Sequence, residues 1–300
     1  MRICSSCLLL TLLFSIFSCK TDPGERDTFK PIFSTYKTDS TGKGVTVVKN
    51  EIFYGILSPV EVCAIFNRLE VPYNNAALNP ISNHDKYLSS SKASINTGIY
   101  GVDFGYLKMF GIGQGMIDYV VTIREMSSKL GIPDDYIMNP LKMLQGETLE
   151  ADTIMDMMND AFYKMENHLR SSGRESTAGL MVVGGWVEAM FIATQLVYDP
   201  LNPDPEVVQR IAEQKYSLNS LLSFIKNYYD DPVVVYYSKK LKYLNNYFDS
   251  FDIYFKMNDL EIDTVKKVFR ASGSDMNVTV ETLNKIKDYI AALRTEMVTP

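Results

Sequence analysis

The sequence predicts an all-α protein, a single multi-helix bundle or array built around two buried helices rich in glycine and alanine. Two observations lead to this class. Apolar residues recur at helical spacing along most of the chain after residue 50. Helix-capping residues and prolines stand where these segments begin, and glycine or proline stands where several of them end.

The first predicted helix begins at the capping box Ser58-Pro59-Val60-Glu61 and ends at Glu70, because Val71-Pro72 disfavours helical backbone. Asp231-Pro232 predicts a second start of the same kind, with proline in the first turn. The predicted helices after the first cover residues 90–110, 114–130, 140–144, 149–169, 175–197, 207–229, 232–255, 260–271 and 280–297.

The predicted helix 90–110 has two unlike sides. One side carries the glycines Gly98, Gly101 and Gly105, and the other carries Lys92, Asn96, Tyr100 and Asp103. Each glycine costs helix stability, so a glycine side indicates the close approach of another helix. The polar side must meet water, a partner or a ligand.

The predicted helix 175–197 is apolar almost all round, so we expect it in the middle of the bundle. Gly185, Ala189 and Ala193 form a small-residue ridge that would fit against the glycines of helix 90–110. Such spacing also occurs in membrane helices, but Glu188 and the polar neighbouring segments favour a water-soluble core. A carboxylate there must be paired, hydrogen-bonded or protonated.

The N-terminus has the pattern of a secretory signal: Arg2, an apolar run from Leu8 to Phe17, and a small residue at Ser18. The run is too short to span a bilayer. Ile16-Phe17-Ser18-Cys19 resembles a bacterial lipobox, although Phe17 is bulkier than usual, and Cys19 would be the lipidated first residue. An ordinary cleaved signal or an N-terminal anchor is the alternative.

The predicted organisation is therefore a signal peptide over 1–18, a lipidated cysteine and flexible tether over 19–50, and an all-helical domain over 51–300. The tether is rich in Thr, Ser, Lys, Asp and Gly. Cys4 and Cys7 leave with the signal and Cys19 carries lipid, so Cys63 remains alone and no intramolecular disulfide is expected. Its apolar neighbours indicate a core residue.

Charge and motifs exclude several function classes. The formal charge of −6 becomes −7 when Arg2 leaves with the signal, and basic patches are missing, so nucleic acid is not an expected partner. The chain has no phosphate-binding loop, nucleophile elbow or CxxC, and its two histidines, His84 and His168, form no recognisable metal set. No cofactor and no metal are expected.

One polar constellation remains, and it would assemble if helices 90–110 and 175–197 were neighbours. It has three interpretations: a buried network that fixes helix register, a ligand pocket, or paired carboxylates for acid–base chemistry. Its members are Lys92, Asn96, Tyr100, Asp103, Tyr106, Trp186, Glu188 and Gln195.

The same residues carry a resemblance. The pattern Asn96-x-Gly98-x-Tyr100-Gly101-x-Asp103-x-x-Tyr106 after Ser91-Lys92-Ala93, followed by Gly184-Gly185-Trp186-x-Glu188 and Gln195, resembles uncharacterised, mostly helical lipoproteins of Gram-negative gut-type bacteria. The resemblance covers nearly the whole mature chain. It implies a helical fold and export, and it implies no activity.

We therefore expect a lipoprotein of the bacterial cell envelope, anchored at the outer membrane, with a non-enzymatic helical domain for binding or scaffolding. Its partners would be the membrane, through the N-terminal lipid, and an envelope protein or small ligand. The sequence leaves open whether the domain faces the periplasm or the outside. The alternative is an envelope hydrolase or small-ligand-binding protein that uses an interior Asp/Glu/Tyr/Trp site.

Overall fold

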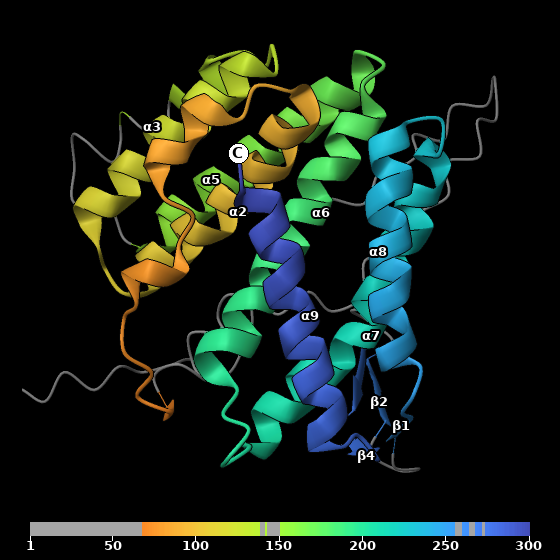
Figure 1. Ribbon diagram of the computed structural model, residues 1–300. Helices are drawn as coiled ribbons and strands as arrows, with labels where there is room; N and C mark the ends of the chain where they lie inside the picture. Colours follow the sequence, from red (N-terminus) through yellow and green to blue (C-terminus); the bar gives the residue numbers. More distant parts are fainter. Residues whose placement is uncertain (1–67, 139–141, 143–150, 256–259, 264–267, 272–273) are drawn as a thin grey trace, which may run out of the picture.

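Two helices, α2 (Ser90–Met109) and α6 (Glu175–Ile192), lie side by side at the centre of the computed structural model (Figure 1). The structure describes residues 68–138, 142, 151–255, 260–263, 268–271 and 274–300. Of these described residues 77% are helical, which confirms the all-α prediction. The predicted signal, Cys19, the tether, Cys63 and the predicted helix 140–144 lie outside the described residues, as does most of the predicted helix 58–70.

The remaining helices surround this pair. α3 (Gly113–Lys129) and α5 (Ala151–Ser171) lie on one side, and α7 (Pro205–Ile225), α8 (Pro232–Phe248) and α9 (Val280–Val298) lie on the other (Figure 1). Short helices fill the connections: η1 (Asn75–Ala77), η2 (Ile81–Lys86), η3 (Ala193–Val197), a π-helical turn, and η4 (Lys226–Tyr228).

Side-chain caps explain where several helices begin. The Asp231 side chain accepts a hydrogen bond from the Val233 N–H at the start of α8, as the Asp-Pro pair predicts. Asp204 caps α7 in the same way through the N–H groups of Glu206 and Val207. The run of valines and tyrosines in α8, which favours a strand in isolation, is helical because its apolar face packs into the core.

Buried apolar residues form two clusters, and the central helices contribute to both. One cluster joins α6 to α7, α8 and α9, and includes Val187, Ile211, Leu221, Leu241 and Ile290. The other joins α2, α3 and α5, and includes Tyr100, Phe104, Ile123, Met165 and Met181. Because α6 separates the clusters and supplies both, it is buried on nearly every side, as its composition predicts.

α2 and α6 approach until their backbones touch. A Cβ atom added to Gly98 would lie 2.0 Å from the carbonyl oxygen of Met181, and one added to Gly184 would lie 2.0 Å from that of Ile95. Glycine is therefore required on both helices. The predicted close crossing is present at Gly98 and Gly185, and Gly184, which was not part of the predicted ridge, takes part in it.

Gly101 has a different neighbour from the one predicted. A Cβ atom there would meet the ring of Phe162 on α5, with its nearest atom at 2.4 Å. An aromatic side chain therefore packs against Gly101, whereas the backbone of α6 packs against Gly98. We still expect Gly101→Leu to lower the melting temperature, but by displacing α5.

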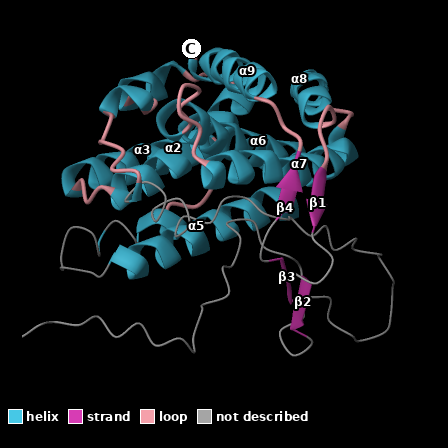
Figure 2. Ribbon diagram, turned by 90° about the horizontal axis from the view of Figure 1, so that it is seen from below, coloured by secondary structure: helices cyan, strands magenta, loops and turns pink. Residues whose placement is uncertain are grey.

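The predicted helix 260–271 is wrong, because the described residues of this range form two antiparallel strands. β1 (Ile253–Phe255) pairs with β4 (Ser274–Met276), and β2 (Leu260–Asp263) pairs with β3 (Val268–Ala271), all antiparallel. β1 and β4 lie beside the helices, and β2 and β3 lie further out (Figure 2). The alternation of Leu260 and Ile262 with Glu261 and Asp263 has the period of two that a strand requires. The prediction of a helix over 232–255 is also wrong at its end, because α8 stops at Phe248 and Ile253–Phe255 form β1.

A substitution pair tests the backbone contact between α2 and α6. Gly98→Ala should destabilise the fold by roughly 1–3 kcal/mol or more, because the added carbon meets fixed backbone rather than a movable side chain. Gly113→Ala is the matched control, since a Cβ there meets nothing within 4 Å. The measurement is the free energy of unfolding by denaturant titration. Equal stability of the two variants would mean that the helices do not approach so closely.

Candidate functional site

The central polar group of the protein joins three helices. Asp103 of α2 and Glu188 of α6 are both 0% exposed, and Arg294 of α9 is 8% exposed. Arg294 holds Glu188 with two hydrogen bonds, from Nε to Oε2 at 2.9 Å and from Nη2 to Oε1 at 3.0 Å. This two-point geometry is the strongest arrangement available to a guanidinium and a carboxylate.

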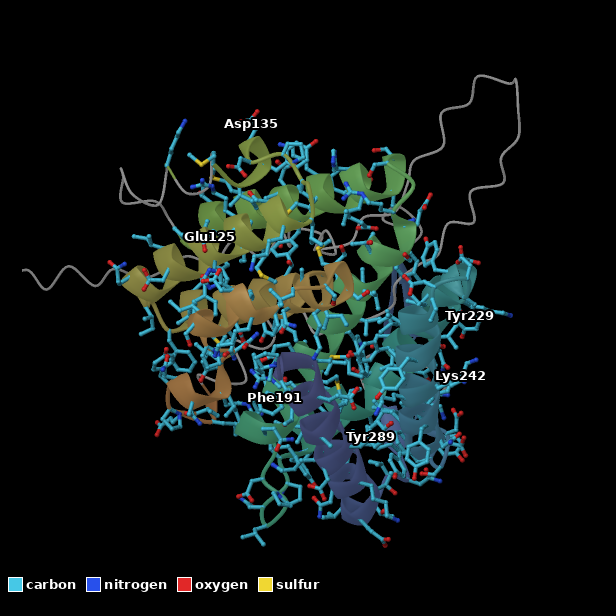
Figure 3. The ribbon with its side chains drawn as sticks, turned by 45° about the horizontal axis from the view of Figure 1, so that its top comes forward. Glu125, Asp135, Phe191, Tyr229, Lys242 and Tyr289 are labelled. Atoms are coloured by element: carbon cyan, nitrogen blue, oxygen red, sulfur yellow. The ribbon has the colours of Figure 1, made fainter. Side chains whose placement is uncertain are left out.

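Two further contacts fix the guanidinium. Arg294 Nη2 also donates to the carbonyl oxygen of Ala77 at 2.9 Å, and the guanidinium lies 4.6 Å from the ring centre of Phe191. Phe191 lies beside α9 in Figure 3. A buried cation is thus covered by a carboxylate, a carbonyl and an aromatic face.

Asp103 is bound less completely than Glu188. Its Oδ2 accepts a hydrogen bond from the Asn79 N–H at 3.0 Å, and its Oδ1 has no hydrogen-bond partner among the described residues. Burial raises the pKa of Asp103 well above its ordinary value, and the negative charge of Glu188 raises it further. Arg294 and the Asn79 N–H oppose this rise.

Asn79 links the helices through an irregular segment. Its Nδ2 donates to Asn96 Oδ1 at 3.0 Å, its Oδ1 accepts from the Tyr87 hydroxyl at 3.1 Å, and its carbonyl accepts from the Tyr119 hydroxyl at 2.8 Å. The Tyr100 hydroxyl donates to the carbonyl of Pro80 at 3.1 Å. An irregular segment can be buried here because side chains satisfy its backbone groups.

The last turn of α9 ends on the same polar region. Lys92 Nζ donates to the carbonyl oxygens of Glu296, Met297 and Thr299 at 2.9, 3.3 and 2.6 Å. Asn96 Nδ2 donates to the Met297 carbonyl at 3.0 Å. The Tyr87 hydroxyl lies 2.8 Å from the Val298 carbonyl oxygen and shares its single proton between that oxygen and Asn79 Oδ1. Carbonyls at the end of a helix lack partners within the helix, and side chains of α2 and the preceding loop supply them.

The structure brings five of the eight predicted constellation residues into one connected region: Lys92, Asn96, Tyr100, Asp103 and Glu188. The other three lie elsewhere. The Tyr106 hydroxyl accepts from the Asn74 N–H at 2.9 Å, Trp186 Nε1 donates to Ser217 Oγ on α7 at 2.9 Å, and Gln195 Nε2 donates to the carbonyl of Lys287 on α9 at 3.0 Å.

Four residues of the network were not predicted: Asn79, Tyr87, Tyr119 and Arg294. Arg294 could have been found from the sequence, because it lies four residues after Ile290 and therefore on the apolar face of the predicted helix 280–297. A charged residue in an apolar stripe needs an interior partner. Asn79 could not have been found in this way, since its role depends on an irregular backbone that periodicity does not describe.

The arrangement favours a structural network over a reactive site. Asn79, Asn96, Asp103 and Glu188 are all fully buried, so a substrate has no approach to the carboxyl pair. Among the described residues no group of three or more His, Cys, Asp or Glu side chains could hold a metal ion. A surface depression of about 320 Å³ beside α5 shares no residue with the network, and Tyr136, Lys164, Asn167, His168 and Ser171 line it.

The residues that carry the resemblance to helical envelope lipoproteins lie on α2 and on the α6–η3 segment, where they fill the centre of the fold. The resemblance itself stays an expectation. Comparisons with protein-family models, with curated proteins and with solved structures gave no match.

Removing the buried guanidinium should be costly. Arg294→Met leaves the Glu188 carboxylate and the Ala77 carbonyl buried without their partner, and breaking a buried pair in this way costs roughly 3–5 kcal/mol. Arg124→Met is the control, because Arg124 pairs with Asp134 at the surface, where solvent screens the charges. Denaturant titration should show a large loss for the first variant and a small one for the second. Equal losses would contradict the buried pair.

Proposed function

We propose that this chain is a bacterial lipoprotein anchored at the cell envelope, whose helical domain binds or organises partners without catalysis. The observation that carries the proposal is the sequence Ile16-Phe17-Ser18-Cys19, at the end of a short apolar run that follows a basic residue. A signal of this kind directs export, and cysteine directly after the small residue is the acceptor for a diacylglyceryl group.

The physical chemistry of such an anchor suits a folded domain of this size. A single acyl chain gives only marginal membrane binding, whereas two chains hold a protein stably, because each buried CH₂ contributes about 0.8 kcal/mol. The segment 19–50 that would follow has an r.m.s. reach of roughly 30 Å if it behaves as a flexible chain. The domain would then stand off the membrane and be free to meet partners.

The character of the central polar group supports a non-catalytic domain. The rival interpretation, an envelope hydrolase or ligand-processing protein, depended on Asp103 and Glu188 lining an accessible cleft. Both side chains are fully buried, and Arg294 occupies the two oxygens of Glu188. Binding would therefore use the outer faces of the helices rather than the interior.

One described helix could be mistaken for a membrane anchor. The segment Glu175–Val197 is long and apolar enough to cross a bilayer by length and composition, yet most of it is buried inside the domain. It also contains Glu188 in its buried middle. Its apolar surface packs into the two core clusters. Anchoring would therefore come from the lipid on Cys19.

Lipid labelling tests the proposal directly. Cells that express the full chain with a labelled fatty acid should incorporate label into the wild-type protein and into Cys63→Ala, and should lose it in Cys19→Ala. The Cys63 variant is the control, because it removes a thiol without touching the signal. Cys19→Ala labelled as strongly as wild type would overturn the lipoprotein assignment.

A further inference from the structure

We propose that Asp103 is protonated in the folded protein and donates a hydrogen bond to Glu188. Docking of α9 would then depend on a proton held inside the core. The first support is the charge of the site. Two fully buried carboxyl groups face one guanidinium, and Arg294 can neutralise only one of them. A second ionised carboxyl would be a buried charge without a counter-ion.

Among the described residues, Arg294 is the cation that acts most strongly on Asp103. Lys92 is on the same helix, but its ammonium group donates to the carbonyls of Glu296, Met297 and Thr299. Apart from Glu188 and Arg294, the titratable groups near Asp103 are hydroxyls: Tyr100 on the same helix, Tyr119 on α3, and Tyr73 before η1. Burial raises the pKa of each, so they are neutral. The site is uncharged overall only when one carboxyl is protonated.

The hydrogen bonds indicate which carboxyl holds the proton. Both oxygens of Glu188 accept from Arg294, which stabilises the ionised form. Asp103 has one oxygen on the Asn79 N–H and a second, buried oxygen that lacks a partner among the described residues. Asp103 and Glu188 are within hydrogen-bonding reach of each other, and two ionised carboxylates are both acceptors only. A proton on Oδ1 of Asp103 therefore satisfies the unpartnered atom.

The proton links three parts of the chain. Asp103 accepts a hydrogen bond from Asn79, and Glu188 accepts hydrogen bonds from Arg294 of α9. Arg294 also donates to the Ala77 carbonyl. Loss of the proton would leave a buried net negative charge and set two carboxylate acceptors against each other, which would destabilise the packing of α2, α6 and α9. The contribution of this proton to the docking of α9 would be greatest in acid and would decline as the pH rises.

The sign of the pH dependence follows from linkage. The pKa of Asp103 is raised in the folded state above its ordinary value of 3.8, so the folded protein binds more protons than the unfolded chain once the pH exceeds that value. The stabilising contribution is complete below the unfolded pKa and falls as the pH rises toward the folded pKa. Within this window the unfolding equilibrium constant should increase by up to about tenfold per pH unit.

Asp103→Asn tests this, because an asparagine can accept from the Asn79 N–H and donate to Glu188 without a proton to lose. In the full chain, the ratio of the wild-type unfolding constant to that of Asp103→Asn should rise with pH above the ordinary pKa of 3.8, by up to about tenfold per unit, and level off above the folded pKa. A constant ratio would overturn the proposal.

Infrared spectroscopy supplies a readout that does not depend on stability. Wild-type protein at neutral pH should show the carbonyl band of a protonated carboxylic acid, and Asp103→Asn should lose it. Glu166→Gln is the control, because Glu166 is another buried carboxyl whose pKa burial raises, and its partner is Arg170. Absence of the band from the wild type, or its loss in Glu166→Gln alone, would overturn the proposal even if Asp103→Asn failed to fold.

Discussion

The contact between the backbones of α2 and α6 is the constraint on which the rest of the structure depends. With glycine at Gly98 and Gly184, no side chain separates the two helices at their crossing. Helices this close bring Asp103 and Glu188 within reach of each other in the interior. Two carboxyl groups in that position require a cation, and α9 supplies it with Arg294. The steric fit of one helix pair thus determines the chemistry at the centre of the domain.

The polar interior has a structural task that apolar packing could not perform. The segment around Asn79 has irregular backbone, and the end of α9 has carbonyls without partners within the helix. Water would satisfy such groups at a surface, but this region is buried. Tyrosine, asparagine and lysine side chains take the place of water and donate hydrogen bonds to these groups. Because hydrogen bonds are directional, they form only when the helices are correctly placed. The network therefore specifies how α9 and the irregular segment dock.

Much of the fold was predictable, because the periodicity of apolar residues and the capping residues mark helices in the sequence. Asp231-Pro232 located the start of α8, and the composition of α6 indicated its central place. The strands Leu260–Asp263 and Val268–Ala271 were missed, because a short stretch with apolar residues at mixed spacing fits either period. In the polar region, residues on the facing sides of α2 and α6 could be paired from sequence. Trp186 and Gln195 could not be placed, since a helix buried all round gives no sign of which neighbour each side meets.

Docking of α9 joins residues that are far apart in the chain: Arg294 binds a carbonyl 217 positions earlier, and Lys92 binds one 207 positions later. Contacts of such separation form slowly, because a long loop must close before they are gained. Glu188 of α6 consequently stays without its counter-ion Arg294 until α9 has been synthesised. Under the export that we propose, this order would help the chain to cross the membrane unfolded, because the core described here cannot close before α9 has been made.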